Sequence, residues 1–321
     1  MSAFRGAERR QIVLYNCLPT TLAHFNTELE ETLVRIGYEP VSRKAEFPID
    51  GDFSRTKRAI GYLREIRSLA RSDAMTISIW PGLGWADGLI CHRSSSPLFS
   101  IMHDPEPIRP QAFMGPAVGR IAGKLNSANW ICHTEIAARS AQKIARVDAA
   151  VALHPILTQK VSKTRIKTHE RRTIAVIGQY KPTRDISILE SIAAQANGEF
   201  SLRIVGRGWP RVKGWKTESR FVEEEELDNI LDTTDVVLIP YRKYWQSGIA
   251  VRAVERGTAV VGESTEFLKM LLGTGYPGLV ESGTTQSWVD AIERTTSYDQ
   301  RAIHSTYQAA VDSSWIRALG D

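Results

Sequence analysis

The chain has 321 residues, of which 42% are hydrophobic, and its formal net charge at pH 7 is +5. This length and apolar content are enough for two domains with cores of their own. The three cysteines are an odd number, and their spacings do not match a disulfide framework. No apolar segment approaches the roughly 20 residues that a membrane helix needs.

The charge is unevenly distributed along the chain. Residues 1–172 carry a net charge of +9 and residues 173–321 a net charge of −4. A basic front half predicts attraction to nucleic acid, anionic lipid or a phosphorylated acceptor. The basic helix expected at residues 55–71 lacks the interleaved aromatic residues of a nucleic-acid surface, which favours an anionic membrane surface, an acceptor phosphate or plain solvation. The polar start MSAFRGAERR does not resemble a signal peptide, so we expect a cytoplasmic protein, with the inner membrane surface as a candidate location.

The first half of the chain alternates between strand and helix patterns. Short apolar runs predict strands, and apolar residues at three- and four-residue steps predict amphipathic helices. The expected strands are 11–16, 76–80, 98–102, 129–133 and 149–153, and the expected helices are 22–36, 55–71, 117–125 and 135–146. This alternation implies a parallel α/β domain.

The alternation restarts after a basic segment that we interpret as a linker, residues 155–172. Expected strands follow at 173–177, 201–205 and 235–240, expected helices begin near residues 185 and 223, and an amphipathic tail covers 298–320. Two Rossmann-like domains are therefore the simplest architecture.

The stretch from Asp235 to Glu263 organises the second half. A fully apolar strand is followed by the aromatic loop 241–246, a helix from Ile249, and a second buried strand after Gly257. Ligands of such βαβ units lie at the carboxyl ends of the strands. Ser247 is a plausible N-cap, so the free amides of this helix would face that position and favour a phosphate.

Several segments of the second half resemble one known family. IGQYKPTRDISIL, IVGRGWP and the segment DVVLIPYRKYWQSGIAVRAVERGTAVV resemble successive donor-binding motifs of GT-B glycosyltransferases of the family-four (group 1) type. SSWIRALG is similar to their last helix, which crosses back to the front domain, and SIMHDPEPIR in the front half resembles their histidine-containing loop. The resemblance is good over residues 173–321 and weaker before them.

This resemblance implies a GT-B fold, an α/β architecture of two Rossmann-like parallel-sheet domains facing across a cleft. Residues 1–165 would form the acceptor-side domain, 166–305 the nucleotide-sugar domain, and 306–321 the helix that crosses back.

The resemblance also implies a set of donor-binding residues. Arg184 would replace the lysine that grips the donor phosphate, and a guanidinium can bind a diphosphate in bidentate fashion. The full implied set is Gly178, Gln179, Arg184, Gly206, Arg207, Phe221, Val222, Tyr241, Ser247, Gly248, Ile249 and Arg252. The family's paired glutamates, however, correspond to Tyr244 and Arg252, so the usual recognition of the ribose is in doubt, and Arg252 is expected to meet a phosphate instead.

Residues of the front half are the candidates for catalysis. His103 and Asp104 directly follow a predicted strand; the matching histidine of the family contacts the donor sugar, and an adjacent acid can act as a general base. Alternatively, Asp104 only begins a turn and His103 satisfies backbone groups. Arg109 is a candidate for binding an anionic acceptor.

The expected function is transfer of a sugar from a nucleotide-diphosphate sugar to a hydroxyl of a saccharide, lipid-linked or protein-linked acceptor. We expect no cofactor and no metal, because arginine, lysine and a helix N-terminus can stabilise the leaving diphosphate. Two alternatives stay open. One is an inactive GT-B partner subunit, and the other is a nucleotide-sugar epimerase, although His304 is the single histidine beyond residue 172.

Overall fold

A computed structural model describes residues 10–90, 96–107, 111, 113–125, 129–159, 171–281, 283–295 and 300–320. The chain folds as two compact units, one formed by Met1–Leu157 with Ala310–Asp321 and the other by Thr158–Ala309. Within the described ranges, no helix combines the length and hydropathy required to cross a bilayer.

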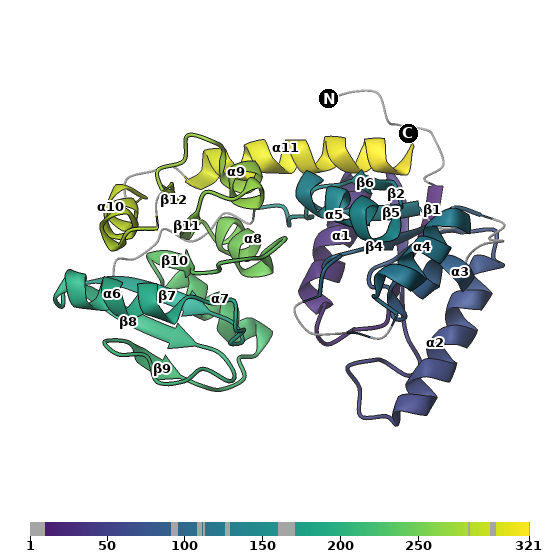
Figure 1. Cartoon of the computed structure of the whole chain (residues 1–321). Helices are drawn as coiled ribbons and strands as arrows, with labels where there is room; N and C mark the ends of the chain where they lie inside the picture. The colour runs from purple at the N-terminus through teal and green to yellow at the C-terminus, as the bar shows by residue number, and fades with distance from the viewer. Residues whose placement is uncertain are drawn as a thin grey trace. The chain divides into compact units, whose positions relative to one another are not determined.

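Unit 1 is built on a six-stranded parallel sheet in the order β2-β1-β3-β4-β5-β6. Figure 1 labels most of the strands and helices of the chain. The strands are β1 (Arg10–Asn16), β2 (Tyr38–Lys44), β3 (Met75–Ser78), β4 (Leu98–Ile101), β5 (Asn129–Cys132) and β6 (Ala149–Val151). The helical segments are α1 (Ala23–Arg35), α2 (Arg55–Ala70), the short 3-10 turn η1 (Gly84–Ala86), α3 (Asp87–Ile90), α4 (Pro116–Leu125) and α5 (Glu135–Ala145). β3, β4 and most of β5 are buried, as expected of strands covered on both faces.

Unit 2 repeats this plan with the strand order β12-β11-β10-β7-β8-β9. Its strands are β7 (Arg172–Ile177), β8 (Phe200–Val205), β9 (Lys216–Glu218), β10 (Val236–Ile239), β11 (Ala259–Glu263) and β12 (Leu279–Val280). Its helices are α6 (Ile186–Ala196), α7 (Glu224–Asp232), α8 (Gly248–Glu255), α9 (Glu266–Leu272) and α10 (Thr285–Thr295). The strand pairings of both sheets are parallel throughout the described ranges.

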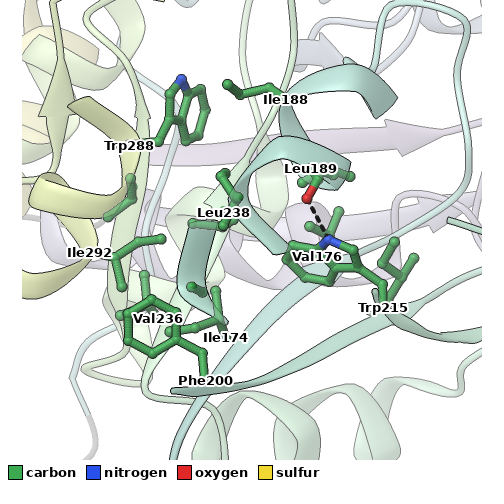
Figure 2. Packing of buried hydrophobic residues seen from close by; sticks show 14 of the residues in the cluster. Ile174, Val176, Ile188, Leu189, Phe200, Trp215, Val236, Leu238, Trp288 and Ile292 are labelled. Carbon is green, nitrogen blue, oxygen red and sulfur yellow. Dashed lines mark hydrogen bonds between the residues drawn. The ribbon is translucent and has the colours of Figure 1, made fainter. Parts of the chain in front are cut away.

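One hydrophobic cluster of unit 2 is formed by its sheet and two helices, α6 and α10. Figure 2 shows Ile174, Val236 and Phe200 packed with Ile292, while Leu189 and Trp215 meet nearby. The indole Nε1 of Trp215 donates to the carbonyl oxygen of Leu189 at 2.7 Å, which satisfies a buried polar group within an apolar cluster.

The last helix, α11 (Gln300–Leu319), begins in the residues of unit 2 and ends in those of unit 1. Its final part is fixed within unit 1 by three polar contacts. The Trp315 indole donates to the Leu153 carbonyl at 3.0 Å, the Leu153 amide donates to the Ser314 hydroxyl at 2.9 Å, and Arg35 pairs with Asp312 at 2.9 Å. Because Trp315 is fully buried, this end of the helix is part of the unit 1 core.

Candidate active site

The strand order of unit 2 places two loops side by side. The chain runs from β7 to β8 and β9 in one direction, and from β10 to β11 and β12 in the other, so β7 and β10 flank a topological switch point. Ligands of open α/β sheets bind at the carboxyl ends of the strands at such a point. The loops that follow β7 and β10 are joined there by an antiparallel bridge between Arg184 and Tyr241.

Two glycines shape the floor of this candidate site. Gly178 follows β7 with φ +102°, and Gly206 follows β8 with φ +153°. A Cβ atom on Gly206 would lie 2.1 Å from the carbonyl oxygen of Gly178, so no larger residue fits. The same carbonyl accepts a hydrogen bond from Trp209 Nε1 at 2.8 Å. Close approach of two backbones therefore explains both glycines.

Arg184 is a buried cation at the switch point, with an exposed fraction of 5%. Its guanidinium carbon lies 4.6 Å from the ring centroid of Tyr241 and 4.9 Å from that of Trp209, and Nη2 donates to the Ile177 carbonyl at 2.9 Å. Burial lowers the pKa of Arg184, and the Tyr241 side chain opposes that shift. The Nε atom is buried and has no hydrogen-bond partner among the described residues. Such a held cation with a spare donor is suited to an anion.

The N-terminus of α8 lies beside Gly178. A Cβ atom added to Gly178 would lie 3.0 Å from Arg184 Nη2 and 3.8 Å from Ile249 Cγ1, so both side chains border this glycine. Ser247 caps α8, with its hydroxyl accepting from the Ala250 amide at 3.3 Å. The amides of Gly248 and Ile249 belong to the first helical turn, which no intrahelical carbonyl reaches. An added Cβ on Gly248 meets nothing within 4 Å, so the backbone there is open to a ligand.

Arg252 does not take the position expected of a phosphate ligand. Its Nε donates to Asp228 at 2.8 Å, its Nη2 donates to the Glu224 carbonyl at 2.9 Å, and its Nη1 pairs with the Glu224 carboxylate. One turn later Arg256 donates to Asp232 at 2.8 Å. The two arginines fasten α8 to α7, so a structural ion pair, and not a phosphate, accounts for Arg252.

The remaining donor-side residues lie around this centre with varied exposure. Gln179, Arg207, Phe221 and Gly248 are exposed, whereas Val222, Tyr241 and Ile249 are half-buried. Tyr244, at the other expected glutamate position, shares a hydrogen bond with Thr265 at 3.0 Å, and burial raises its pKa. It therefore remains neutral and cannot replace a carboxylate.

In unit 1, His103 follows β4 as the sequence predicts. Its Nε2 contacts the Ile79 carbonyl at 2.9 Å, so that nitrogen carries the proton, and its ring stacks on Trp80 with centroids 5.4 Å apart. Burial lowers the pKa of His103. Asp104 is half-buried beside it, and Arg109 lies outside the described residues.

His103 belongs to a cluster that sequence reasoning missed. His133 follows β5 and His154 lies beyond β6, and the rings of all three pack around Phe25 of α1 with centroid distances of 4.8 to 5.5 Å. His133 Nδ1 donates to the Ala152 carbonyl at 2.7 Å, while its Nε2 is buried with no hydrogen-bond partner in the described part of the chain. Burial lowers the pKa of His133 well below its ordinary value, so its Nε2 is a hydrogen-bond acceptor. The sequence does carry a signal for this cluster, because each of the three histidines follows a strand of the same parallel sheet within a few residues.

Comparisons with known proteins bear on this geometry. HepE of Anabaena, crystallised with UDP and glucose, superposes with a TM-score of 0.66 at 13% identity, over 97% of this chain and 99% of HepE. A glycosyltransferase of Rickettsia africae gives a TM-score of 0.65 at 9% identity, over 98% and 100% of the two chains. The chain has the GT-B fold. The expected pair of parallel Rossmann-like sheets is thereby confirmed.

The sequence relationship is more limited than the fold relationship. No family model matches the chain. The D-inositol 3-phosphate glycosyltransferase of Corynebacterium aurimucosum is 30% identical over 155 residues, which are 46% of this chain and 36% of that protein. The structure of TarM matches with a TM-score of 0.61 at 12% identity, and the match covers 58% of the TarM chain. This GT-B chain thus resembles the family-four type and spans less than two thirds of the length of both relatives.

Proposed function

We propose that this GT-B protein is a glycosyltransferase that uses a nucleotide-diphosphate sugar and passes the sugar to a hydroxyl of a saccharide, lipid-linked or protein-linked acceptor. The observation that carries the proposal is Arg184, a buried guanidinium whose Nε has no hydrogen-bond partner among the residues that the structure describes, next to Gly178, which also borders the N-terminus of α8. The relatives support the sugar-transfer class, and HepE was crystallised with UDP and glucose.

The proposed mechanism depends on stabilising the departing diphosphate. Arg184 supplies a full positive charge held between Tyr241 and Trp209, and the first amides of α8 supply oriented N–H dipoles. Both are fixed before the reaction, so they stabilise developing negative charge without reorganisation. Because the chain itself provides these positive groups, the proposed reaction requires no divalent metal, and turnover is expected to persist in the presence of a chelator.

The same proposal assigns the acceptor side to unit 1. Asp104, half-buried in the loop after β4, is the proposed general base. His103, neutral and fixed by the Ile79 carbonyl, is the proposed contact to the donor sugar. Arg109 remains the proposed contact to an anionic acceptor.

Gly248 offers a sharp test of the helix-terminus part. Gly248→Pro deletes one amide N–H at the first position of α8, where proline is tolerated, and the preceding Ser247 already has extended dihedrals of −141° and 103°. Gly248→Ala keeps the amide and adds a methyl group into open space. A charge-assisted hydrogen bond is worth about 1.5–3 kcal/mol, so proline should weaken binding of a nucleoside diphosphate by about 10- to 100-fold and alanine should not.

Arg184 tests the electrostatic part in the same assay. Release of nucleoside diphosphate from a nucleotide sugar should fall by about 10²- to 10³-fold in Arg184→Ala, while Arg211→Ala, an exposed arginine of the same unit, should match the wild type. Circular dichroism of each variant checks that unit 2 remains folded. Equal activity of the wild type and folded Arg184→Ala would contradict the proposed role.

One observation favours a second candidate, a binding subunit without turnover. Tyr244 and Arg252 occupy the positions of the family's glutamates, and both are engaged within unit 2. A thermal-shift screen of nucleotide sugars, followed by an activity assay with acceptor mixtures, separates the two functions. A ligand at 100 times its dissociation constant should stabilise the protein by about 2.7 kcal/mol. Stabilisation without turnover in any mixture would identify the binding subunit.

A further inference from the structure

Helix α2 presents one face made of cations and a single apolar side chain. Residues at helical positions i, i+3, i+7, i+10 and i+14 share one side of a helix. In α2 and its C-cap these residues are Lys57, Ile60, Arg64, Arg67 and Arg71, and all five are exposed. At about 1.5 Å per residue this α2 stripe is about 21 Å long.

The opposite face of α2 fixes the stripe to unit 1. Tyr62, Ile66 and Leu69 are buried in a hydrophobic cluster with Tyr15. Glu65, the acidic residue within α2, points to that side as well, because its carboxylate accepts from the Tyr15 hydroxyl at 2.7 Å and from the Glu46 amide at 2.9 Å. The cations of the stripe are therefore not neutralised by an acid of their own helix, and they are held on a packed element.

Apolar side chains accompany the cations. Ile60, between Lys57 and Arg64 in the stripe, is 62% exposed. Phe53, in the bend before the helix, is 41% exposed and lies next to Phe47, with ring centroids 5.3 Å apart. A flat partner with negative charge at its surface and hydrocarbon below satisfies both kinds of side chain. Nucleic-acid surfaces combine cations with aromatic platforms for bases, and the stripe itself holds no aromatic residue.

We propose that the α2 stripe docks this protein on an anionic lipid bilayer, with its cations at the lipid headgroups and Ile60 and Phe53 entering the headgroup region. This inference concerns where the protein works and stands independently of the reaction in unit 2. Each cation near an anionic bilayer strengthens binding by about fivefold, and the attraction falls as salt shortens the screening length from about 10 Å at 0.1 M to about 3 Å at 1 M.

Vesicle co-sedimentation of the full chain tests the proposal. The protein should bind vesicles of phosphatidylglycerol with phosphatidylcholine, should be released by high salt, and should not bind vesicles of phosphatidylcholine alone. Arg64→Glu with Arg67→Glu should reduce binding by at least about 25-fold. The control, Arg211→Glu with Lys213→Glu, makes the same change in net charge at exposed positions of unit 2 and should bind like the wild type.

Ile60→Ser separates the apolar contribution, because it leaves every charge in place. It should lower vesicle binding several-fold, and it replaces an exposed side chain, so folding should be unaffected. Equal loss of binding in the control pair would show a net-charge effect and overturn the assignment to α2. The lipid assignment would also be overturned if the protein bound duplex DNA or RNA more strongly than anionic vesicles and lost that binding in the variant with Arg64→Glu and Arg67→Glu. Nucleic acid would then be the partner of the stripe.

Discussion

Asp87 controls a loop of unit 1, and its ionisation should be visible in the stability of the protein. Its side chain is completely buried. The carboxylate accepts from the Tyr62 hydroxyl and from the Leu83 amide at 3.3 Å, and the Tyr62 oxygen in turn accepts from the Gly82 amide at 2.9 Å. Together these bonds hold the loop that follows β3, next to the point where the strand order of unit 1 reverses.

The size of the effect follows from the pKa of this carboxyl. Burial raises the pKa of Asp87 from 3.8 to about 7, and the hydrogen bonds from Tyr62 and the loop amides only partly oppose that rise. Between these two pH values the folded protein keeps a proton that the unfolded chain has lost. The free energy of unfolding contributed by this group is therefore fully present below about pH 4 and falls by about 4 kcal/mol as the pH rises through 7.

Asp87→Asn isolates this contribution, because the amide has the shape of the protonated acid and does not ionise. We expect the difference in free energy of unfolding, variant minus wild type, to rise by about 4 kcal/mol between pH 4 and pH 8. Urea unfolding followed by tryptophan fluorescence at several pH values measures it. Asp73→Asn, which removes a carboxyl group at an exposed position, is the matched control variant. A flat or falling difference for Asp87→Asn would refute the reasoning.

Three further changes test other parts of the structure. His133→Gln should become more stable relative to the wild type as the pH falls below 6.5, because burial lowers the pKa of His133 and only the unfolded wild type gains a proton on that ring. Urea unfolding at several pH values measures this, and a difference in free energy of unfolding that does not change with pH would contradict the buried neutral ring. Gly206→Ala should cost about 3 kcal/mol or more, because its Cβ would lie 2.1 Å from the Gly178 carbonyl, whereas Gly198→Ala, with φ +84° and open space, should cost only about 1 kcal/mol in the same denaturation assay. Arg252→Met should lower the free energy of unfolding by only about 1 kcal/mol, because the side chains of Glu224 and Asp228 are 57% and 35% exposed and stay hydrated. Nucleotide binding measured by calorimetry should be retained. Loss of nucleotide binding with unchanged stability would restore the phosphate role of Arg252.

Much of the architecture was predictable, because it depends on local patterns. The buried runs of β3, β4, β7 and β10 and the periodic helices α1, α2 and α5 read directly as strands and helices. The edge strand β2 was missed: most of its residues are exposed and it contains Pro40, so it lacks an apolar run. The short elements β9 and β12 have only three and two residues, too few to form a pattern.

The sequence by itself determined the alternation of strands and helices, and with it the parallel sheets, the loops after β7 and β10, and the cap at Ser247. Only the tertiary structure decided which charged side chains at the loops after β7 and β10 are available to bind a ligand. Arg184 and Arg252 are both buried arginines in unit 2. The Arg184 Nε has no hydrogen-bond partner in the described ranges and its guanidinium lies near two aromatic rings, whereas Arg252 is neutralised by acids of α7. The same holds for His133 and Asp87, whose ionisation depends on neighbours brought together from distant parts of the chain. Periodicity along a chain reports which face is buried, whereas charge and hydrogen bonding depend on side chains that meet only after folding.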